Sequence, residues 1–298
     1  MSINSSALFQ HIQRCNLARI QGYRIPFFVS ENTFPFGWVE PNLIDELKNY
    51  GVRYYNNALY TDHTETEFLT GLGEFLAHRG QYKPHHELFD VYSDITLPPI
   101  STIDRGALPL LGIIGMGVHM NGLTRKQGKT YLWVAKRSAD KRLDPSKLDH
   151  IVAGGIPAGL NAYFTLIKEA DEEASIPPSI MQTATYARKI SYTIDRPEGL
   201  RRDILFCYDL NLPEDFTPTP KDGEVESFSL IPLEEVAEIV CTTQRFKFNV
   251  NLVLIDLFIR HGLIEPTTPE AIKLSEMLDP LCNSQPDLIK KHPLFAQL

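Results

Sequence analysis

Three glutamates stand close together in one short segment, at a spacing that could bind a metal ion. Glu169, Glu172 and Glu173 occupy positions i, i+3 and i+4, which share one face of an α-helix. Carboxylates this close repel one another, and a divalent cation relieves the repulsion because Mg²⁺ and Mn²⁺ prefer oxygen ligands. An acidic face standing alone is ordinarily just solvated, so the metal hypothesis depends on the segments around it.

Those neighbouring segments favour a functional site. A glycine-rich turn, G-G-I-P-A-G, runs from Gly154 towards the helix. The helix face opposite the glutamates carries residues that suit burial, namely Tyr163, Ile167, Ala170 and Ala174. One face could therefore hold a metal ion while the other anchors the helix to a core.

The whole segment resembles the Nudix hydrolase signature, G-x5-E-x7-R-E-U-x-E-E-x-G-U, where U is bulky and apolar. Aligned from Gly154, the residues Glu169, Glu172 and Glu173 fall on its three metal-binding glutamates. The resemblance implies that these side chains bind the metal ion together with the Gly154 carbonyl. It also implies that Glu169 and Glu173 are catalytic residues.

Three positions depart from the signature. Leu160 replaces the first Glu, Lys168 replaces Arg, and Ser175 replaces the closing Gly. In the family, that Glu and that Arg pair with each other and brace the loop. Because losing both together strands neither charge, the departures concern how the loop is held more than they concern the chemistry.

A second acidic element, K-D-G-E-V-E, begins at Lys221. By itself such a segment is ordinarily a polar turn before a strand. Nudix proteins often supply a further carboxylate to the metal cluster from a loop at about this point. The resemblance therefore makes Glu224 a third catalytic candidate, as an extra ligand or base, with Glu226 as the second choice.

Local basic residues must contact an anionic substrate, because the chain as a whole has a net charge of −8. Lys136 and Arg137 follow a predicted strand, and Arg188 lies between apolar runs, so these three are the substrate-binding candidates. Together the parts predict metal-dependent hydrolysis of a diphosphate. A metal ion neutralises phosphate charge and lowers the pKa of a bound water, and a nearby glutamate can take the proton of that water.

Longer phrases resemble one Nudix branch, described as thiamine pyrophosphokinase-related. They include L-D-H-I-V-A-G-G-I-P-A-G, V-L-I-D-L-F-I-R-H-G and, near the front, H-I-Q-R-C-N-L-A-R-I-Q-G-Y-R-I-P-F. The resemblance implies hydrolysis of thiamine diphosphate and its oxidised (oxo- and oxy-) analogues to the monophosphate and phosphate, which would clear damaged coenzyme. The front domain is the expected source of selectivity. Aromatic candidates for contacting the heterocycle are Phe34, Phe36, Trp38 and Trp133, although such residues are more often core.

Three alternatives stay open. The chain could be a Nudix hydrolase for another nucleoside-diphosphate-linked substrate such as ADP-ribose. It could be an isopentenyl diphosphate isomerase, although none of its four cysteines sits in a recognisable isomerase motif. It could also be a non-catalytic diphosphate-binding module, although such modules usually lose the glutamates that this chain keeps.

Composition bounds the remaining possibilities. The net charge of −8 argues against nucleic-acid and anionic-membrane partners, and no run of about 18 apolar residues predicts a membrane span. The start of the chain lacks a signal-peptide pattern. The four scattered cysteines predict reduced thiols and a cytoplasmic location. The histidines, including His119 and His150, are isolated in the sequence and predict no competing metal site.

The element pattern predicts the α/β class. Residues 106–265 are expected to form a Nudix α/β/α sandwich around a mixed sheet, and residues 1–105 a smaller mixed α+β N-terminal domain. Residues 266–298 are expected to be a helical tail. Apolar runs bounded by turn residues predict the strands, the first of them at Leu108–Val118, and Asn121–Gly122 predicts a turn.

Overall fold

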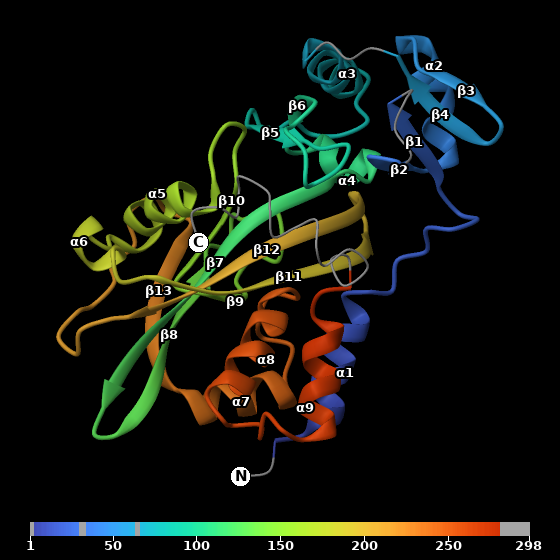
Figure 1. The fold of residues 1–298 in the computed structure, drawn as a ribbon. Helices are drawn as coiled ribbons and strands as arrows, with labels where there is room; N and C mark the ends of the chain where they lie inside the picture. Colours follow the sequence, from blue (N-terminus) through green and yellow to red (C-terminus); the bar gives the residue numbers. More distant parts are fainter. Residues whose placement is uncertain (1–2, 30–33, 63–65, 281–298) are drawn as a thin grey trace.

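The computed structural model describes residues 3–29, 34–62 and 66–280, and a mixed sheet forms its centre (Figure 1). The sheet has seven strands, with the order β11-β12-β7-β8-β13, while β10 pairs with β7 and β9 with β8. Its β7 and β12 pair in parallel and its other neighbours pair antiparallel. The strands are β7 (Ile114–Lys126), β8 (Lys129–Arg137), β9 (Leu148–Asp149), β10 (Val152–Gly155), β11 (Thr185–Arg196), β12 (Gly199–Asn211) and β13 (Val225–Pro232).

Helices cover both faces of this sheet, because its strands are apolar on both sides. Along β12, Leu205 and Cys207 face one core, whereas Ile204, Phe206 and Tyr208 face the other, as the two-residue period of a strand requires. The first core is covered by α1 (Ser5–Arg14), α7 (Leu233–Thr242), α8 (Val250–Arg260) and α9 (Pro269–Met277). The second is covered by α5 (Ala162–Ala174) and α6 (Pro178–Met181). The predicted α/β/α sandwich is confirmed.

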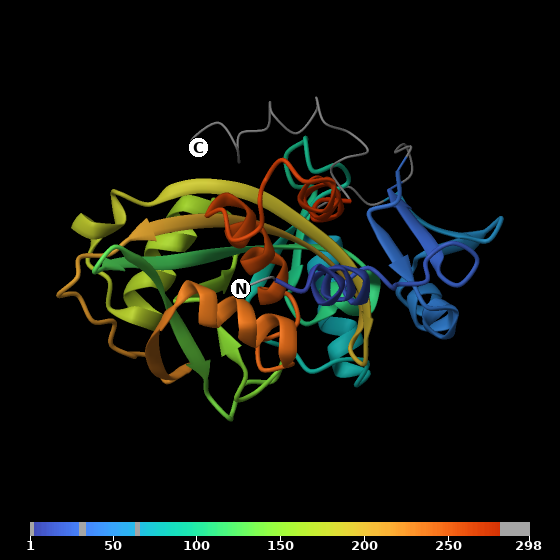
Figure 2. The ribbon, with the colours of Figure 1, turned by 90° about the horizontal axis from the view of Figure 1, so that it is seen from below.

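A smaller α+β unit with its own core lies at one end of the large sheet (Figures 1 and 2), as predicted. Its four-stranded sheet has the order β2-β1-β4-β3, and a two-stranded hairpin, β5–β6, lies between it and the large sheet. Its elements are β1 (Ile25–Val29), β2 (Gly37–Val39), η1 (Pro41–Leu43), α2 (Ile44–Tyr50), β3 (Arg53–Tyr55), β4 (Ala58–Thr61), α3 (Thr66–His78), β5 (Leu88–Val91), β6 (Ser101–Asp104) and α4 (Ala107–Leu111). We call this group, from β1 to α4, the front unit.

Helix α1 precedes the front unit in sequence but packs on the large sheet's helical layer. Its Leu8 and Ile12 are buried in the same core as α8, and the His11 Nε2 lies 2.8 Å from the Val240 carbonyl oxygen. Figure 2 shows α1 alongside the C-terminal helices. The division of the chain at residue 105 stays a prediction, but α1 lies with the large sheet. Of the predicted tail, α9 joins this layer, and residues 281–298, with Cys282, lie outside the described residues.

Two local predictions are wrong. The apolar run Leu108–Val118 is not one strand, because α4 occupies its start and ends at Gly112, whose φ of 60° is left-handed. Asn121–Gly122 is not a turn but lies inside β7, where the Asn121 side chain donates to Asp209 at 2.9 Å. The turn comes at Gln127–Gly128, both with positive φ, the conformation that a tight hairpin needs. Within the part of the chain that is described, no helix is long and apolar enough to cross a membrane.

Candidate functional site

The glutamates are positioned by β10, the loop that follows it, and α5. The Asn161 side chain caps the start of α5 by accepting a hydrogen bond from the Phe164 N–H at 2.9 Å. The helix ends at Ser175, which has the left-handed φ of 53° that the signature's glycine usually adopts. The Ser175 hydroxyl donates to the Thr219 carbonyl at 2.9 Å. Ser175, which stands where the signature has glycine, is thus held at the end of the helix by this hydrogen bond.

Glu173 is the most buried of the three glutamates, with 6% of its surface exposed. Its Oε2 accepts a hydrogen bond from the Ala153 N–H on β10 at 2.8 Å. Burial raises the pKa of Glu173 well above its ordinary value, and the nearby carboxylates of Glu169, Asp149 and Glu224 raise it further. Its charged form is therefore costly as long as no cation stands beside it.

Glu169 lies directly against the glycine turn. A Cβ atom at Gly154 would sit 2.4 Å from the Glu169 carboxyl carbon, so only glycine permits this approach. Burial raises the pKa of Glu169, although the neighbouring Lys168 opposes that rise. The structure thus brings the backbone at Gly154 close to one partly buried carboxylate, Glu169, and one buried carboxylate, Glu173. Oxygen donors gathered in this way suit a hard cation.

Glu172 is turned outward and is paired with a lysine. The Lys168 Nζ lies 2.6 Å from Glu172 Oε2 and 3.3 Å from Glu169 Oε1. Lys168 stands at the signature's arginine position, yet its partners are the glutamates of its own helix. The lysine therefore supplies positive charge to the acidic face of α5.

Glu224 reaches the same neighbourhood from the loop before β13. A small pocket there is lined by side chains of Arg137, Lys141, Asp149, His150, Glu173 and Glu224. Glu224 forms an ion pair with Lys141. Although burial raises the pKa of Glu224, the hydrogen bond and charge of Lys141 outweigh it, and the pKa lies below the ordinary value. Glu226 instead points to solvent and pairs with Lys136 at 2.7 Å.

The three predicted substrate-binding cations lie in three different environments. Arg137 is buried and pairs with Asp149 at 2.7 Å, while its other N–H groups donate to the carbonyls of Leu143 and Asp144. Lys136 stays half-exposed beside Glu226. Arg188 on β11 donates to Asp256 and Ser275, both at 3.0 Å. The structure therefore does not bring Arg188 to the glutamates, because β11 directs it towards α8 and α9.

Arg105, a cation outside every motif considered above, comes from the front unit. Its guanidinium lies 5.4 Å from the centre of the Phe89 ring and pairs with Glu87 at 3.0 Å. The guanidinium carbon of Arg105 would lie 3.3 Å from a Cβ atom placed on Gly155. The charge of Arg105 also helps to lower the pKa of Glu224. No sequence motif surrounds Arg105, so its position near the glycine turn is apparent only from the packing of the front unit.

The aromatic candidates for a heterocycle divide between core and surface. Phe36 is buried against Phe27, with ring centres 4.5 Å apart. Trp133 is buried in the core beneath α5. Trp38 lies in β2, paired with Pro26, and the Phe34 side chain is 54% exposed. Phe36 and Trp133 therefore serve packing.

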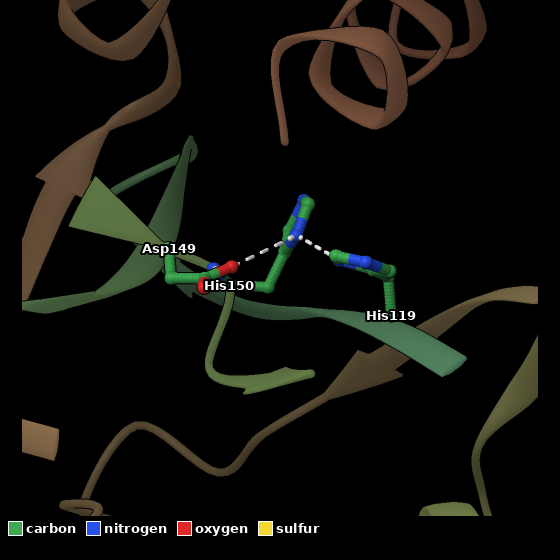
Figure 3. Close-up of side chains that lie close together, drawn as sticks. All are labelled: His119, Asp149 and His150. Atoms are coloured by element: carbon green, nitrogen blue, oxygen red, sulfur yellow. Dashed lines mark hydrogen bonds and ion pairs between the residues drawn. The ribbon is translucent and has the colours of Figure 1, made fainter. Parts of the chain in front are cut away.

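The fold also brings together two histidines that the sequence left isolated. The Nδ1 atoms of His119 and His150 lie 2.9 Å apart, and Asp149 lies beside them (Figure 3). Within the described chain, this is the group whose potential ligand atoms all fall within 4.8 Å of one another. The two rings meet although 31 residues separate them, because His119 lies on β7 and His150 comes just before β10, the strand that pairs with β7. That the histidines form no competing metal site stays a prediction.

Charge balance argues that this buried group is a structural network. Asp149 lies 2.7 Å from Arg137 Nη1 and 3.6 Å from Lys247 Nζ. Burial raises the pKa of Asp149, but the two cations outweigh it and hold the pKa below its ordinary value. Burial lowers the pKa of His150 to about 4 and that of His119 well below its ordinary value. One carboxylate therefore already faces two cations, whereas the glutamates of α5 face one.

Comparison with known proteins agrees with the signature. Residues 115–248 match the family described as the NUDIX domain. The chain is 36% identical over 297 residues to Nudix hydrolase 20, chloroplastic, of Arabidopsis thaliana, which covers 92% of this chain and 79% of that protein. It is 37% identical over 292 residues to Nudix hydrolase 24, chloroplastic, of the same plant, with the same two coverages. Among solved structures, the NUDIX domain of Shewanella oneidensis NrtR complexed with ADP ribose is similar with a TM-score of 0.40 and 13% identity, covering 49% of this chain and 87% of that one.

These relatives correct the predicted location. The sequence predicted a cytoplasmic protein, and that prediction is wrong because both plant relatives are named chloroplastic. The physical reason is that free cysteines such as Cys15, Cys207 and Cys241 report a reducing environment. They do not distinguish one reducing compartment from another.

Proposed function

The chain belongs to the Nudix family of diphosphate hydrolases, and we propose that its substrates are thiamine diphosphate and the oxidised analogues of that coenzyme. The products are the monophosphate and phosphate. The proposal has two supports: the carboxylate site around α5, and the sequence phrases of the thiamine-related branch. Those phrases run from α1 into β1, the first strand of the front unit, and recur around β10 and in α8. The site supports the reaction type, and the phrases support the substrate.

The reaction type is supported by Glu169, which is partly buried, and Glu173, which is buried, beside Gly154. Burial raises the pKa of both carboxyls, so their charged forms are unfavourable unless a cation compensates. The oxygen donors and the close approach to Gly154 suit a hard divalent ion. These residues fit the Mg²⁺ or Mn²⁺ that Nudix hydrolases use, with Glu169, Glu173 and the Gly154 carbonyl as ligands and Glu172 after release from Lys168.

The chemistry at this site divides among named residues. A bound divalent ion supplies charge neutralisation for the diphosphate and a water of lowered pKa. Glu224 keeps its carboxylate form because Lys141 lowers its pKa, so it is suited to accept the proton of that water. Glu169 and Glu173 would hold such an ion, and a fixed ion would keep the reacting phosphate in position. Binding of an anionic substrate competes for Lys141 and frees Glu224 as the base.

Phosphate contacts come from residues around the pocket. Lys141 is 23% exposed and Arg105 42% exposed at the side chain, so both can turn to a diphosphate. Lys136, also half-exposed, keeps its proposed role beside them, whereas Arg137 acts indirectly by fixing Asp149 and the loop at Leu143. The front unit faces the glycine turn through Arg105 and Phe89, which supports a role for that unit in substrate selection.

A substrate panel tests the proposal. Phosphate release by the full-length protein is measured with Mg²⁺ and with Mn²⁺, for thiamine diphosphate, oxothiamine diphosphate, oxythiamine diphosphate, ADP-ribose and nucleoside diphosphates. We expect the highest kcat/KM for one of the thiamine forms. Faster hydrolysis of ADP-ribose or a nucleoside diphosphate than of every thiamine form would overturn the thiamine assignment and leave the diphosphatase assignment intact. Tight thiamine diphosphate binding without turnover would instead indicate a binding module.

A further inference from the structure

We propose that the front unit braces the catalytic loop of this chain, and that Asp90 is the positioning residue of that brace. The loop is the segment 154–160, which runs from the end of β10 towards α5. The inference rests on the proposed function, because it assigns a purpose to the position of that loop. It concerns how the loop is held, and the residues that form the brace, Leu88, Phe89 and Asp90, are not among the proposed metal ligands.

Hairpin β5–β6 contacts the loop at three points. The Leu88 carbonyl accepts a hydrogen bond from the Ala158 N–H at 2.8 Å. The Asp90 Oδ2 accepts a hydrogen bond from the Gly159 N–H at 3.0 Å. The Phe89 ring covers Gly155 so closely that a Cβ there would lie 2.4 Å from the ring. Figure 1 shows the hairpin beside the end of β10.

These contacts take the place of an internal ion pair that the loop lacks. In the signature, a Glu and an Arg brace the loop from within, but this chain has Leu160 and Lys168 at those positions. Leu160 packs against the core beneath α5, and Lys168 is paired with Glu169 and Glu172. A loop whose own side chains supply no brace must satisfy its backbone N–H groups elsewhere, and two of them are satisfied by the front unit.

The brace is itself held firmly. Tyr92, two residues beyond Asp90 on the same side of the chain, has a pKa raised by burial and further by the charge of Asp90 and a hydrogen bond with it. The Asp90 carboxylate therefore accepts hydrogen bonds from both the Tyr92 hydroxyl and the Gly159 N–H. Strand β5 is paired with β6, with Asp90 opposite Thr102, and Thr102 in turn accepts a hydrogen bond at its carbonyl from the Thr70 hydroxyl of α3 at 2.8 Å. The loop is thus linked to the body of the front unit.

The arrangement has a functional consequence. The loop carries Gly154, whose backbone lies against the Glu169 carboxyl. If the brace loosens, Gly154 and Glu169 lose their fixed spacing, and metal affinity falls before the fold does. Substitution of groups that orient metal ligands typically costs about 10- to 100-fold in metal affinity.

The test uses Asp90→Ala in the full chain and needs no substrate. Mn²⁺ binding is titrated by electron paramagnetic resonance, and hydrogen exchange is followed at the amides of Ala158 and Gly159. We expect Mn²⁺ affinity to fall by roughly tenfold, with faster exchange at both amides and a melting temperature close to that of the unaltered protein. Asp90→Asn keeps an oxygen acceptor and should restore most of the affinity.

A matched control is Asp94→Ala. Asp94 lies in the same unit, and its side chain accepts hydrogen bonds from Thr96 within its own turn, so Mn²⁺ affinity should not change. If the unaltered protein binds no Mn²⁺, the proposed function fails. If it binds Mn²⁺ and Asp90→Ala binds it equally well with unchanged exchange, the brace is refuted while the function stands. Should Asp90→Ala not fold, Phe89→Leu decides, because its ring no longer covers Gly155 and unchanged exchange at Ala158 would refute the brace.

Discussion

Two clusters of potential metal ligands share the walls of one pocket, and they differ in charge balance. The buried group of His119, Asp149 and His150 has the closer ligand atoms, yet its carboxylate already faces Arg137 and Lys247. The pair Glu169 and Glu173 is less tightly gathered, yet it holds two carboxylates whose pKa values burial raises. The first cluster is internally neutralised, and the second needs a cation.

Ligand spacing alone therefore does not identify a metal site. A divalent ion in the histidine group would have to displace two cations from a buried carboxylate, at the cost of leaving them unpaired. The same ion beside Glu169 and Glu173 would relieve a charge that burial already penalises. We therefore expect the histidine cluster to serve the structure, and we propose the glutamate pair as the metal site.

Disrupting the cluster of His119, Asp149 and His150 should have the largest effect, which is a loss of folding stability. Asp149→Asn leaves Arg137 and Lys247 buried without their carboxylate, and losing one partner of a buried ion pair typically costs about 3–5 kcal/mol. We expect the melting temperature to fall by roughly 10 °C or more, measured by calorimetry without metal. A variant that melted within a degree or two of the unaltered protein would show that Asp149 is not the electrostatic centre of the network.

Breaking the unneutralised cluster should leave the fold intact and remove activity. Glu173→Gln deletes one charge while its side-chain oxygen can still accept from the Ala153 N–H. We expect a rate loss of roughly a hundredfold or more, measured as phosphate release at saturating Mg²⁺. Asp171→Asn is the control, because Asp171 lies on the same helix but pairs with Lys221 at the surface. Near-normal turnover in Glu173→Gln would remove Glu173 from the essential ligands.

The number of bound metal ions also distinguishes the two clusters. His119→Ala should leave the number of bound Mn²⁺ ions unchanged, whereas Glu169→Gln should weaken binding by about tenfold or more. The comparison is made by equilibrium titration at one pH, with each variant's folding checked by circular dichroism. Loss of a bound ion in His119→Ala would show that the neutral cluster is a metal site after all.

The smallest effect concerns acid stability. Burial lowers the pKa of His150 to about 4, from about 6.5 in an unfolded chain. The neutral ring is therefore favoured in the fold, and this contribution is full above about pH 6.5 and is lost as pH falls towards 4. His150→Asn should flatten the decline of the melting temperature between those values, by a few degrees. A decline as steep as that of the unaltered protein would place the acid sensitivity in other groups.

Much of the fold is readable from the chain because its signals are local. Apolar runs bounded by turn residues predicted a mixed sheet, and the spacing of the glutamates predicted the helix that is α5. The failures share one cause. Asn121 has a turn residue's chemistry, but its side chain bonds to Asp209 in a neighbouring strand, and that tertiary contact overrides local preference.

The candidate site divides in the same way. The sequence by itself determined the glutamates of α5, the glycine turn and the chemistry that they can perform, because spacing along one helix fixes which side chains share a face. Only the tertiary structure decided that Arg188 leaves the site, that Arg105 and Asp90 join it from the front unit, and that two distant histidines meet around Asp149. Such contacts join residues far apart in sequence, and they depend on how strands pair and units dock, which no local pattern encodes.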